Sequence, residues 1–279
     1  MTVFNVTANG AVMPAIGFGT FRMPESEVLK VVPEAIKTGF RHIDTAQFYD
    51  NESAVGQAII ESGVAREDIF LTTKIRPDRL APEVFVSSLH QSLKDLKTDY
   101  VDLLLLHWPV FRDAPLEAQI ATLNEVRSAG LVRHIGVSNY TVDLMRQAVA
   151  LSEAPIVTNQ IEFHPYLRQD LVYAEARKLG LSVTGYFAMA NGQVHEDEVL
   201  KTIAARTGKT VAQVVLRWAI QHEGVAVLSK TATVARVREN FDIFDFELTP
   251  EDMTAISGLT RSGSRMAKPE AYAPVWDND

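Results

Sequence analysis

Two kinds of segment alternate along this chain, and their order constrains the fold more than any other feature. Eight short runs rich in apolar and β-branched residues are separated by longer stretches whose apolar residues recur at helical spacing. The run at 101–106 is apolar almost throughout, as in a parallel strand covered on both faces. Eight strand and helix units in this order predict an α/β fold, the (β/α)8 or TIM barrel. The candidate strands are residues 16–20, 42–45, 69–75, 101–108, 134–138, 156–161, 182–187 and 225–229.

Helix signals between the candidate strands agree with a barrel. In the stretch 82–96 the apolar residues share one stripe of a helix, namely Val84, Phe85, Leu89, Leu93 and Leu96. Glycines follow four such stretches just before a strand, where helices commonly end in a left-handed residue: Gly39, Gly63, Gly130 and Gly180. An open doubly wound sheet is the structural alternative. It is disfavoured because the run GFGTFR at 17–22 lacks the third glycine of the dinucleotide-binding fingerprint.

The start of the chain predicts a β-hairpin. Val3, Phe4 and Val6 lead into Asn9-Gly10, a pair that tolerates the positive φ of a tight turn. We expect this hairpin to close one end of the barrel.

The other end of the chain, residues 260–279, has no helical or strand periodicity and is expected to form a C-terminal loop segment. It could cover a pocket with Tyr272 or Trp276, or it could fray. The 279 residues are close to the roughly 250 of a typical barrel, so we expect one domain at 1–279.

Composition excludes several classes of function. The net charge of −8 would repel nucleic acid, and an anionic ligand would need a local cluster of cations. The absence of cysteine excludes disulfides, thiolate zinc sites and cysteine nucleophiles, and we expect no metal. No signal peptide or apolar run long enough for a bilayer is present, so we expect a cytoplasmic monomer without a membrane partner.

Polar residues stand where the second, third and fourth strands end, and the C-terminal ends of strands carry the chemistry of barrels. Asp44 ends the second strand, and Tyr49 lies in the following loop. Lys74 closes the third strand and His107 the fourth. All four side chains are therefore expected to face one cavity.

Together these residues suit the reduction of a carbonyl group. Hydride transfer leaves an alkoxide that a tyrosine hydroxyl can protonate. A free phenol has a pKa near 10, so the Lys74 ammonium is expected to lower the pKa of Tyr49, while Asp44 keeps Lys74 charged. A ring N–H of neutral His107 would align the substrate oxygen.

Each residue alone also has an ordinary structural explanation. Asp44 could cap a helix, Lys74 could be a strand-end charge, and His107 could be a hydrogen-bonded structural histidine. Four complementary groups at neighbouring strand ends favour catalysis over that reading.

Several motifs in this order resemble the aldo-keto reductase family over nearly the whole chain. They are GTF at 19–21, RHIDTAQFYDNE at 41–52, TK at 73–74, DL at 102–103, HWP at 107–109, GVSN at 136–139, NQIE at 159–162 and REN at 238–240. The resemblance implies that Asp44, Tyr49, Lys74 and His107 are the catalytic tetrad of the family. It implies binding of NADPH as well, with Gly19, Thr20, Phe21, Ser138, Asn139, Gln160 and Tyr186 among the contacts.

Ser138, Asn139 and Gln160 correspond to partners of the nicotinamide carboxamide, and Tyr186 would lie against the ring. Ser138-Asn139 could instead cap a helix that begins near Val142, and Tyr186 could belong to the core.

Cations follow the eighth strand, where barrels often bind phosphate. Lys230 and Thr231 end that strand and Arg236 follows on the next helix, so we expect these residues to bind a 2′-phosphate and to favour NADPH over NADH. A solvated helix face is the alternative. By resemblance, Glu239 and Asn240 lie near the adenine.

Three aromatic residues, Phe21, Phe48 and Trp108, are candidates for the substrate pocket, although each could simply pack. Arg76 stands where many relatives carry an aromatic residue. It is expected either to bind a substrate carboxylate or to pair with Asp78 on the surface.

Two segments depart from the commonest family pattern. The run FAMANG at 187–192 replaces the usual sequence after Tyr186, so contacts of a pyrophosphate there are not transferred. This run and the ending KPEAYAPVWD at 268–277 look similar to bacterial 2,5-diketo-gluconate and methylglyoxal reductases.

The leading hypothesis is therefore reduction of a small aldehyde or ketone by NADPH, with Tyr49 as the proton donor. A Schiff-base aldolase that uses Lys74 is one alternative, because barrels host that chemistry too. A barrel that binds NADPH as a sensor, with vestigial activity, is another.

Overall fold

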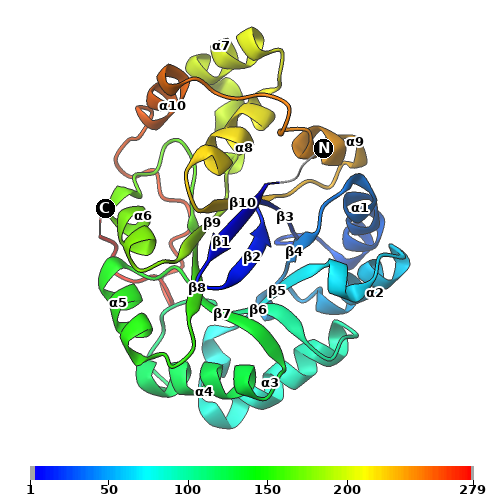
Figure 1. Ribbon diagram of the computed structural model, residues 1–279, viewed down its shortest axis with the longest axis vertical. Coiled ribbons are helices and arrows are strands. Elements are labelled where there is room, and N and C mark those ends of the chain that lie inside the picture. Colours follow the sequence, from blue (N-terminus) through cyan, green and yellow to red (C-terminus); the bar gives the residue numbers. More distant parts are fainter. Residues whose placement is uncertain (1–3, 278–279) are drawn as a thin grey trace.

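The computed structural model describes residues 4–277 and confirms the predicted barrel. Eight parallel strands close on themselves, with β10 paired to both β9 and β3 (Figure 1). Their ends lie within two residues of the predicted ends. In order around the ring the strands are β3 (Ile16–Gly19), β4 (His42–Asp44), β5 (Phe70–Ile75), β6 (Val101–Leu106), β7 (Val132–Ser138), β8 (Ile156–Glu162), β9 (Ser182–Tyr186) and β10 (Val225–Ser229).

Helices cover the outside of this ring (Figure 1). Those between successive strands are α1 (Glu25–Thr38), α2 (Glu52–Glu61), α3 (Pro82–Asp95), α4 (Leu116–Ser128), α5 (Val142–Leu151) and α6 (Asp170–Lys178). Two helices, α7 (Glu198–Thr207) and α8 (Val211–Gln221), precede β10, and α9 (Val234–Phe241) and α10 (Pro250–Ser257) follow it. Within residues 4–277, no helix is both long and apolar enough to cross a membrane.

The helix ends follow the glycine signals in the sequence. Gly39 and Gly180 adopt φ of 130° and 78°, a region that favours residues without a Cβ, and Gly63 and Gly130 do the same at 72° and 78°. The prediction is wrong for one residue of the apolar stripe on α3. Val84 is 42% exposed, because it lies in the first turn beyond the edge of the sheet-facing stripe that buries Phe85 and Leu89.

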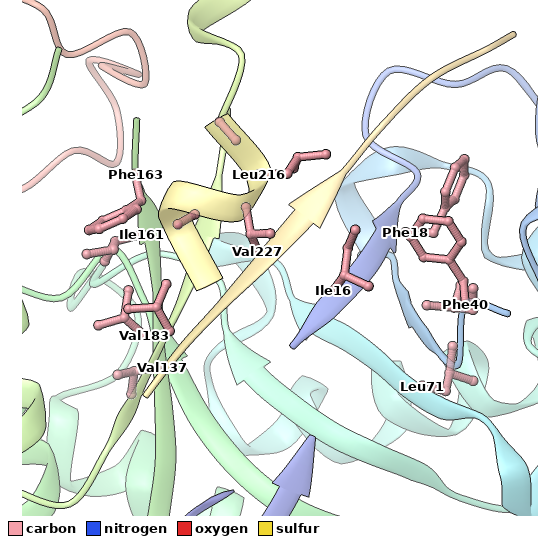
Figure 2. Packing of buried hydrophobic residues seen from close by; sticks show 14 of the residues in the cluster. Ile16, Phe18, Phe40, Leu71, Val137, Ile161, Phe163, Val183, Leu216 and Val227 are labelled. Atoms are coloured by element: carbon pink, nitrogen blue, oxygen red, sulfur yellow. The ribbon is translucent and has the colours of Figure 1, made fainter. Parts of the chain in front are cut away.

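Apolar residues form a layer between the sheet and the helices, and a second, smaller cluster fills the barrel. Figure 2 shows part of the outer layer, in which Phe18 and Phe40 meet edge to face with ring centroids 5.5 Å apart. Strand β6 serves both layers, because Leu104 faces outward while Leu103 faces the interior. Burying each such leucine contributes about 1.5–3 kcal/mol.

The predicted hairpin is present as β1 (Asn5–Ala8) and β2 (Ala11–Pro14); Val3 lies outside the described residues. Its turn places Asn9 and Gly10 at φ of 45° and 87°. The Asn9 side-chain amide donates to the carbonyl oxygen of Ile156, the first residue of β8, at 2.8 Å. Since the hairpin lies across the N-terminal ends of the strands (Figure 1), the cavity described next opens at the opposite end.

Candidate active site

The four residues expected to act together meet at the C-terminal end of the barrel. Asp44 is the last residue of β4, and Lys74 stands one residue before the end of the adjacent β5. His107 follows β6 directly. Tyr49 ends the short 3-10 helix η1 (Gln47–Tyr49), which folds back over the strand ends. Three neighbouring βα connections thus supply the whole set.

Lys74 is the centre of this group. Its Nζ donates to Asp44 Oδ1 at 2.6 Å, to the carbonyl oxygen of Thr45 at 2.9 Å and to Tyr49 Oη at 3.2 Å. The side chains of Lys74 and Asp44 are 0% and 2% exposed, so this ion pair is fully desolvated. All three donors of the ammonium are occupied, and no free amine is presented for a Schiff base.

His107 stands beside Tyr49, with ring centroids 5.8 Å apart. Burial, followed by the positive charge of Lys74, holds the pKa of His107 well below its usual range, so the ring is neutral at pH 7. Its Nδ1 is buried and has no hydrogen-bond partner within residues 4–277. A neutral imidazole can donate one hydrogen bond without delivering a proton, which is the role expected of His107 from the sequence.

The direction of the Tyr49 pKa shift differs from the sequence expectation. Loss of solvation, followed by the negative charge of Asp44, raises the pKa of Tyr49 well above its ordinary value. Burial also lowers the pKa of Lys74, and the charge and hydrogen bond of Asp44 oppose that shift. The physical cause is that burial destabilises the Tyr49 phenolate more than the Lys74 ammonium stabilises it, because the Asp44 carboxylate already neutralises that ammonium. Tyr49 is therefore protonated at neutral pH.

A buried polar network outside the barrel, missed by the sequence reasoning, fixes the segment that carries Tyr49. The Gln47 side-chain amide donates to Ser88 and Ser92 hydroxyls of α3, and its oxygen accepts from the backbone N–H of Arg76 at 3.1 Å. Glu52 accepts from the hydroxyls of Thr73 and Ser92 at 2.6 and 3.0 Å. Both residues fall within the RHIDTAQFYDNE run, which was the available signal.

Residues expected around a nicotinamide line the same cavity and are bonded to one another. Gln160 donates to Asp44 Oδ2 at 2.8 Å, and Ser138 donates to the carbonyl oxygen of Gln160 at 2.8 Å. Tyr186 donates to Asn139 Oδ1 at 2.6 Å. The helix-capping alternative does not apply to Ser138 and Asn139, because Thr141 is the residue that caps α5.

Only some of the residues expected to bind phosphate or to lie near the adenine reach the cavity. Lys230 and Arg236 are exposed, and neither forms an ion pair with any residue in 4–277. Lys230 and Asn240 line the cavity, whereas Thr231, Arg236 and Glu239 lie outside its lining. The Glu239 carboxylate accepts from the hydroxyl of Thr210, the N-cap of α8, at 2.9 Å.

The cavity has a volume of about 660 Å³ and is lined by Asp44, Tyr49 and His107 together with the nicotinamide candidates. The expectation that all four catalytic candidates face it is wrong for Lys74, which is fully buried and reaches the cavity only through its bonds to Asp44 and Tyr49. Gly19, Phe21, Phe48 and Trp108 line it as well. Thr20 does not: it is fully buried, and its hydroxyl donates to the carbonyl oxygen of Asp44 at 3.1 Å.

Arg76 also lies outside the lining of this cavity. Its Nε bonds to Asp78 at 2.7 Å, the surface pairing considered as an alternative, and its guanidinium lies 4.6 Å from the Phe48 ring centroid.

The C-terminal loop segment covers one side of the cavity. Residues 260–277 have neither helix nor strand, as predicted. Met266, Ala267, Lys268, Pro269 and Tyr272 line the cavity. Tyr272 contacts Phe48 with ring centroids 5.7 Å apart, and Trp276 contacts Trp108 at 6.3 Å. Of the two alternatives considered from composition, the structure supports the covering segment.

Backbone strain gathers around the same cavity. Four of its lining residues that carry a Cβ have left-handed backbone, namely Arg22, Asn139, Phe187 and Asn191, at φ of 55°, 64°, 57° and 52°. Each such position costs about 1–3 kcal/mol and persists where surrounding contacts enforce it. Phe187 and Asn191 belong to the run that departs from the commonest family pattern, so its unusual sequence accompanies an unusual backbone.

Comparisons with known proteins agree with this geometry. Residues 15–261 match the model of the aldo/keto reductase family. The methylglyoxal reductase DkgB of Escherichia coli O157:H7 is 43% identical over 267 residues, which are 95% of this chain and 99% of that protein. The glyoxal reductase of Bacillus subtilis (strain 168) is 40% identical over 254 residues, 91% of each chain. A crystal structure described as a putative 2,5-diketo-D-gluconic acid reductase B has 55% identity and a TM-score of 0.97, covering 99% of this chain and 98% of that one.

Proposed function

Because the chain belongs to the aldo/keto reductase family, we propose that this oxidoreductase reduces small dicarbonyl compounds to hydroxycarbonyl products with NADPH, and that Tyr49 donates the proton. The observation that carries the proposal is the position of the Lys74 ammonium. It bonds both the Asp44 carboxylate and the Tyr49 hydroxyl at a cavity wall that also holds His107.

The chain's own residues divide the work of protonation. A nicotinamide cofactor, when bound, supplies the hydride that adds to the carbonyl carbon. A ring N–H of His107 orients the carbonyl oxygen, and Tyr49 gives its proton to that oxygen as negative charge grows there. The raised pKa of Tyr49 keeps the phenol protonated beforehand. Lys74 then stabilises the phenolate through the contact at 3.2 Å, and Asp44 keeps Lys74 charged.

The donor set fits NADPH in two places, beside the catalytic residues and around the end of β10 and α9. Near the catalytic residues, amide and hydroxyl groups of Ser138, Asn139 and Gln160 suit a carboxamide, and the Tyr186 ring suits an aromatic face. Lys230, which lines the cavity, and Arg236, which lies outside the lining on α9, have no acidic partner within residues 4–277 and can pair with a 2′-phosphate. We assign Gly19, Thr20, Phe21, Thr231, Glu239 and Asn240 to the same cofactor.

The substrate class follows from the relatives and from the lining of the cavity. The relatives are named for methylglyoxal, glyoxal and 2,5-diketo-gluconate, which all carry two carbonyl groups. Phe48 and Trp108 give the pocket apolar walls beside the catalytic residues. Arg76 would bind a substrate carboxylate only after its ion pair with Asp78 opens.

A substrate panel run with NADPH and with NADH in parallel tests the proposal. We expect steady turnover of methylglyoxal and 2,5-diketo-gluconate, with a lower KM for NADPH than for NADH. If the protein turns over none of the carbonyl compounds, the hypothesis of an NADPH sensor is favoured. Covalent trapping of a substrate on Lys74 by borohydride would favour the aldolase. We further propose that the chain works as one domain and as a cytoplasmic monomer.

A further inference from the structure

We infer that Glu162 is a positioning residue that holds the substrate-side wall of the cavity in place through the backbone of the C-terminal segment. The inference rests on the proposed function for its substrate readout, but not for its structural readout. It concerns a carboxylate that takes no part in the chemistry described above.

Glu162 joins two segments that are far apart in the sequence. It ends β8, two residues after Gln160, and is 0% exposed. Its carboxylate accepts from the backbone N–H of Met266 at 2.8 and 3.1 Å and from that of Ala267 at 2.7 Å. Hydrogen bonds from backbone to carboxylate are about twice as strong as neutral ones. Met266 and Ala267 belong to the C-terminal loop segment 260–277, called the covering segment below, and are therefore held against the strand that carries Gln160. We call this set of hydrogen bonds the Glu162 tie.

A third donor leaves this carboxylate no freedom. His164 Nε2 lies 2.8 Å from Glu162 Oε1, and His164 Nδ1 accepts from the backbone N–H of Tyr166 at 3.3 Å. Because Nδ1 accepts, Nε2 is the nitrogen that carries a proton and donates to Glu162. Donors thus converge on both carboxylate oxygens. A glutamine at position 162 has one acceptor oxygen and one NH2 group. In either orientation of its side-chain amide, the NH2 group would point at one of these donors.

The tied residues lead directly into the cavity wall. Met266 and Ala267 line the cavity, and so do Lys268, Pro269 and Tyr272. Tyr272 reaches Phe48 on the catalytic side. Further along, the Asp277 carboxylate accepts from the backbone N–H of Val142 at 2.9 Å, in the first turn of α5.

The two ties differ in strength. The bond at Asp277 is exposed to solvent, whereas the Glu162 tie is buried and accepts from three groups. Weakening Glu162 should therefore release the wall that Tyr272 supports and leave Tyr49, Lys74 and His107 in place.

The effect should depend on substrate size. A small molecule such as methylglyoxal needs the catalytic residues and little of the wall, whereas the longer 2,5-diketo-gluconate would extend towards the covering segment. Loss of a wall that contacts only the distal part of a substrate raises KM more than it lowers kcat.

Two variants test the inference from opposite sides. Glu162→Gln removes one acceptor from β8, and Ala267→Pro removes one donor from the covering segment without altering the barrel. Ser264→Ala is the matched control, because it cuts a different bond of the covering segment, from the Ser264 hydroxyl to the carbonyl oxygen of Tyr166 in the loop after β8, at 2.6 Å. Kinetics with saturating NADPH are combined with trypsin cleavage after Arg265, followed by mass spectrometry. That cleavage requires local opening of the segment and no substrate.

For both test variants, we expect KM for 2,5-diketo-gluconate to rise about tenfold, kcat for methylglyoxal to stay within about twofold, and cleavage after Arg265 to accelerate. The control should change each by less. Unchanged KM and cleavage in both test variants would overturn the inference. An equal loss of kcat on both substrates would also overturn it, because Glu162 would then act on the catalytic residues. If the wild-type protein reduces neither dicarbonyl, the proposed function fails while the cleavage rates still decide the role of Glu162.

Discussion

The two ends of the cavity are built on opposite principles. At β4 and β5, Lys74 and Asp44 are buried, and the ammonium and both carboxylate oxygens are bonded to protein partners. At β10 and α9, Lys230 and Arg236 are exposed and have no ion-pair partner within residues 4–277. Groups that take part in chemistry gain from being fixed beforehand, because the cost of ordering them falls on folding. Groups that only hold an anion can remain solvated until it arrives.

The largest effect is expected when the proton donor is removed from the buried end at β4, β5 and β6, called the fixed end below. Tyr49→Phe should lower kcat about 10²–10⁴-fold while the Kd for NADPH changes little, because only the hydroxyl is lost. Stopped-flow turnover and cofactor fluorescence measure the two quantities. Near-native turnover of methylglyoxal would show that Tyr49 is not the donor.

Removing the ammonium should damage stability as well as activity. Lys74→Met leaves the Asp44 carboxylate buried without a counter-ion, so the free energy of unfolding should fall by about 3–5 kcal/mol. Chemical denaturation measures this. The double variant Asp44→Asn/Lys74→Met should regain much of the stability but no activity. If the double variant were as unstable as the single one, burial of an unpaired charge would not be the cause.

A cation at the solvent-exposed end, near β10 and α9, should behave differently. Arg236→Ala should raise KM for NADPH about tenfold, leave KM for NADH nearly unchanged, and not alter thermal stability, because an exposed side chain without a partner stabilises little. Arg238→Ala is the matched control, since Arg238 is also exposed on α9. Equal effects of the two variants would remove Arg236 from the phosphate site.

The smallest expected effect concerns pH. Burial lowers the pKa of His107 in the folded protein, so below pH 6.5 the unfolded chain binds a proton that the folded chain does not. The free energy of unfolding should therefore decrease as pH falls from 6.5, by at most about 1.4 kcal/mol per pH unit for this group. His107→Gln should flatten the slope measured by denaturation between pH 7 and pH 5. A slope that is the same in the variant would mean that His107 does not contribute to it.

The fixed end could be predicted from the sequence to a large extent, because it depends on local order. Asp44 and Lys74 stand at the ends of recognisable strands, and parallel strands bring their ends together whatever the details of packing. The direction of the Tyr49 pKa shift could not be predicted, since it depends on how much water the assembled site excludes. The Glu162 tie was also out of reach, because it joins backbone groups more than a hundred positions away. The Glu-x-His spacing at 162–164 was its one local signal.

The order of the strands around the barrel has a consequence for recombination. Asp44, Tyr49, Lys74 and His107 all precede α4, whereas the proposed 2′-phosphate contacts Lys230 and Arg236 follow it. A chimaera joined within α4 to a homologue of opposite coenzyme preference should inherit its chemistry from one parent and its coenzyme preference from the other. The Gln160–Asp44 and Asn139–His107 hydrogen bonds are among the contacts that such a crossover would have to preserve.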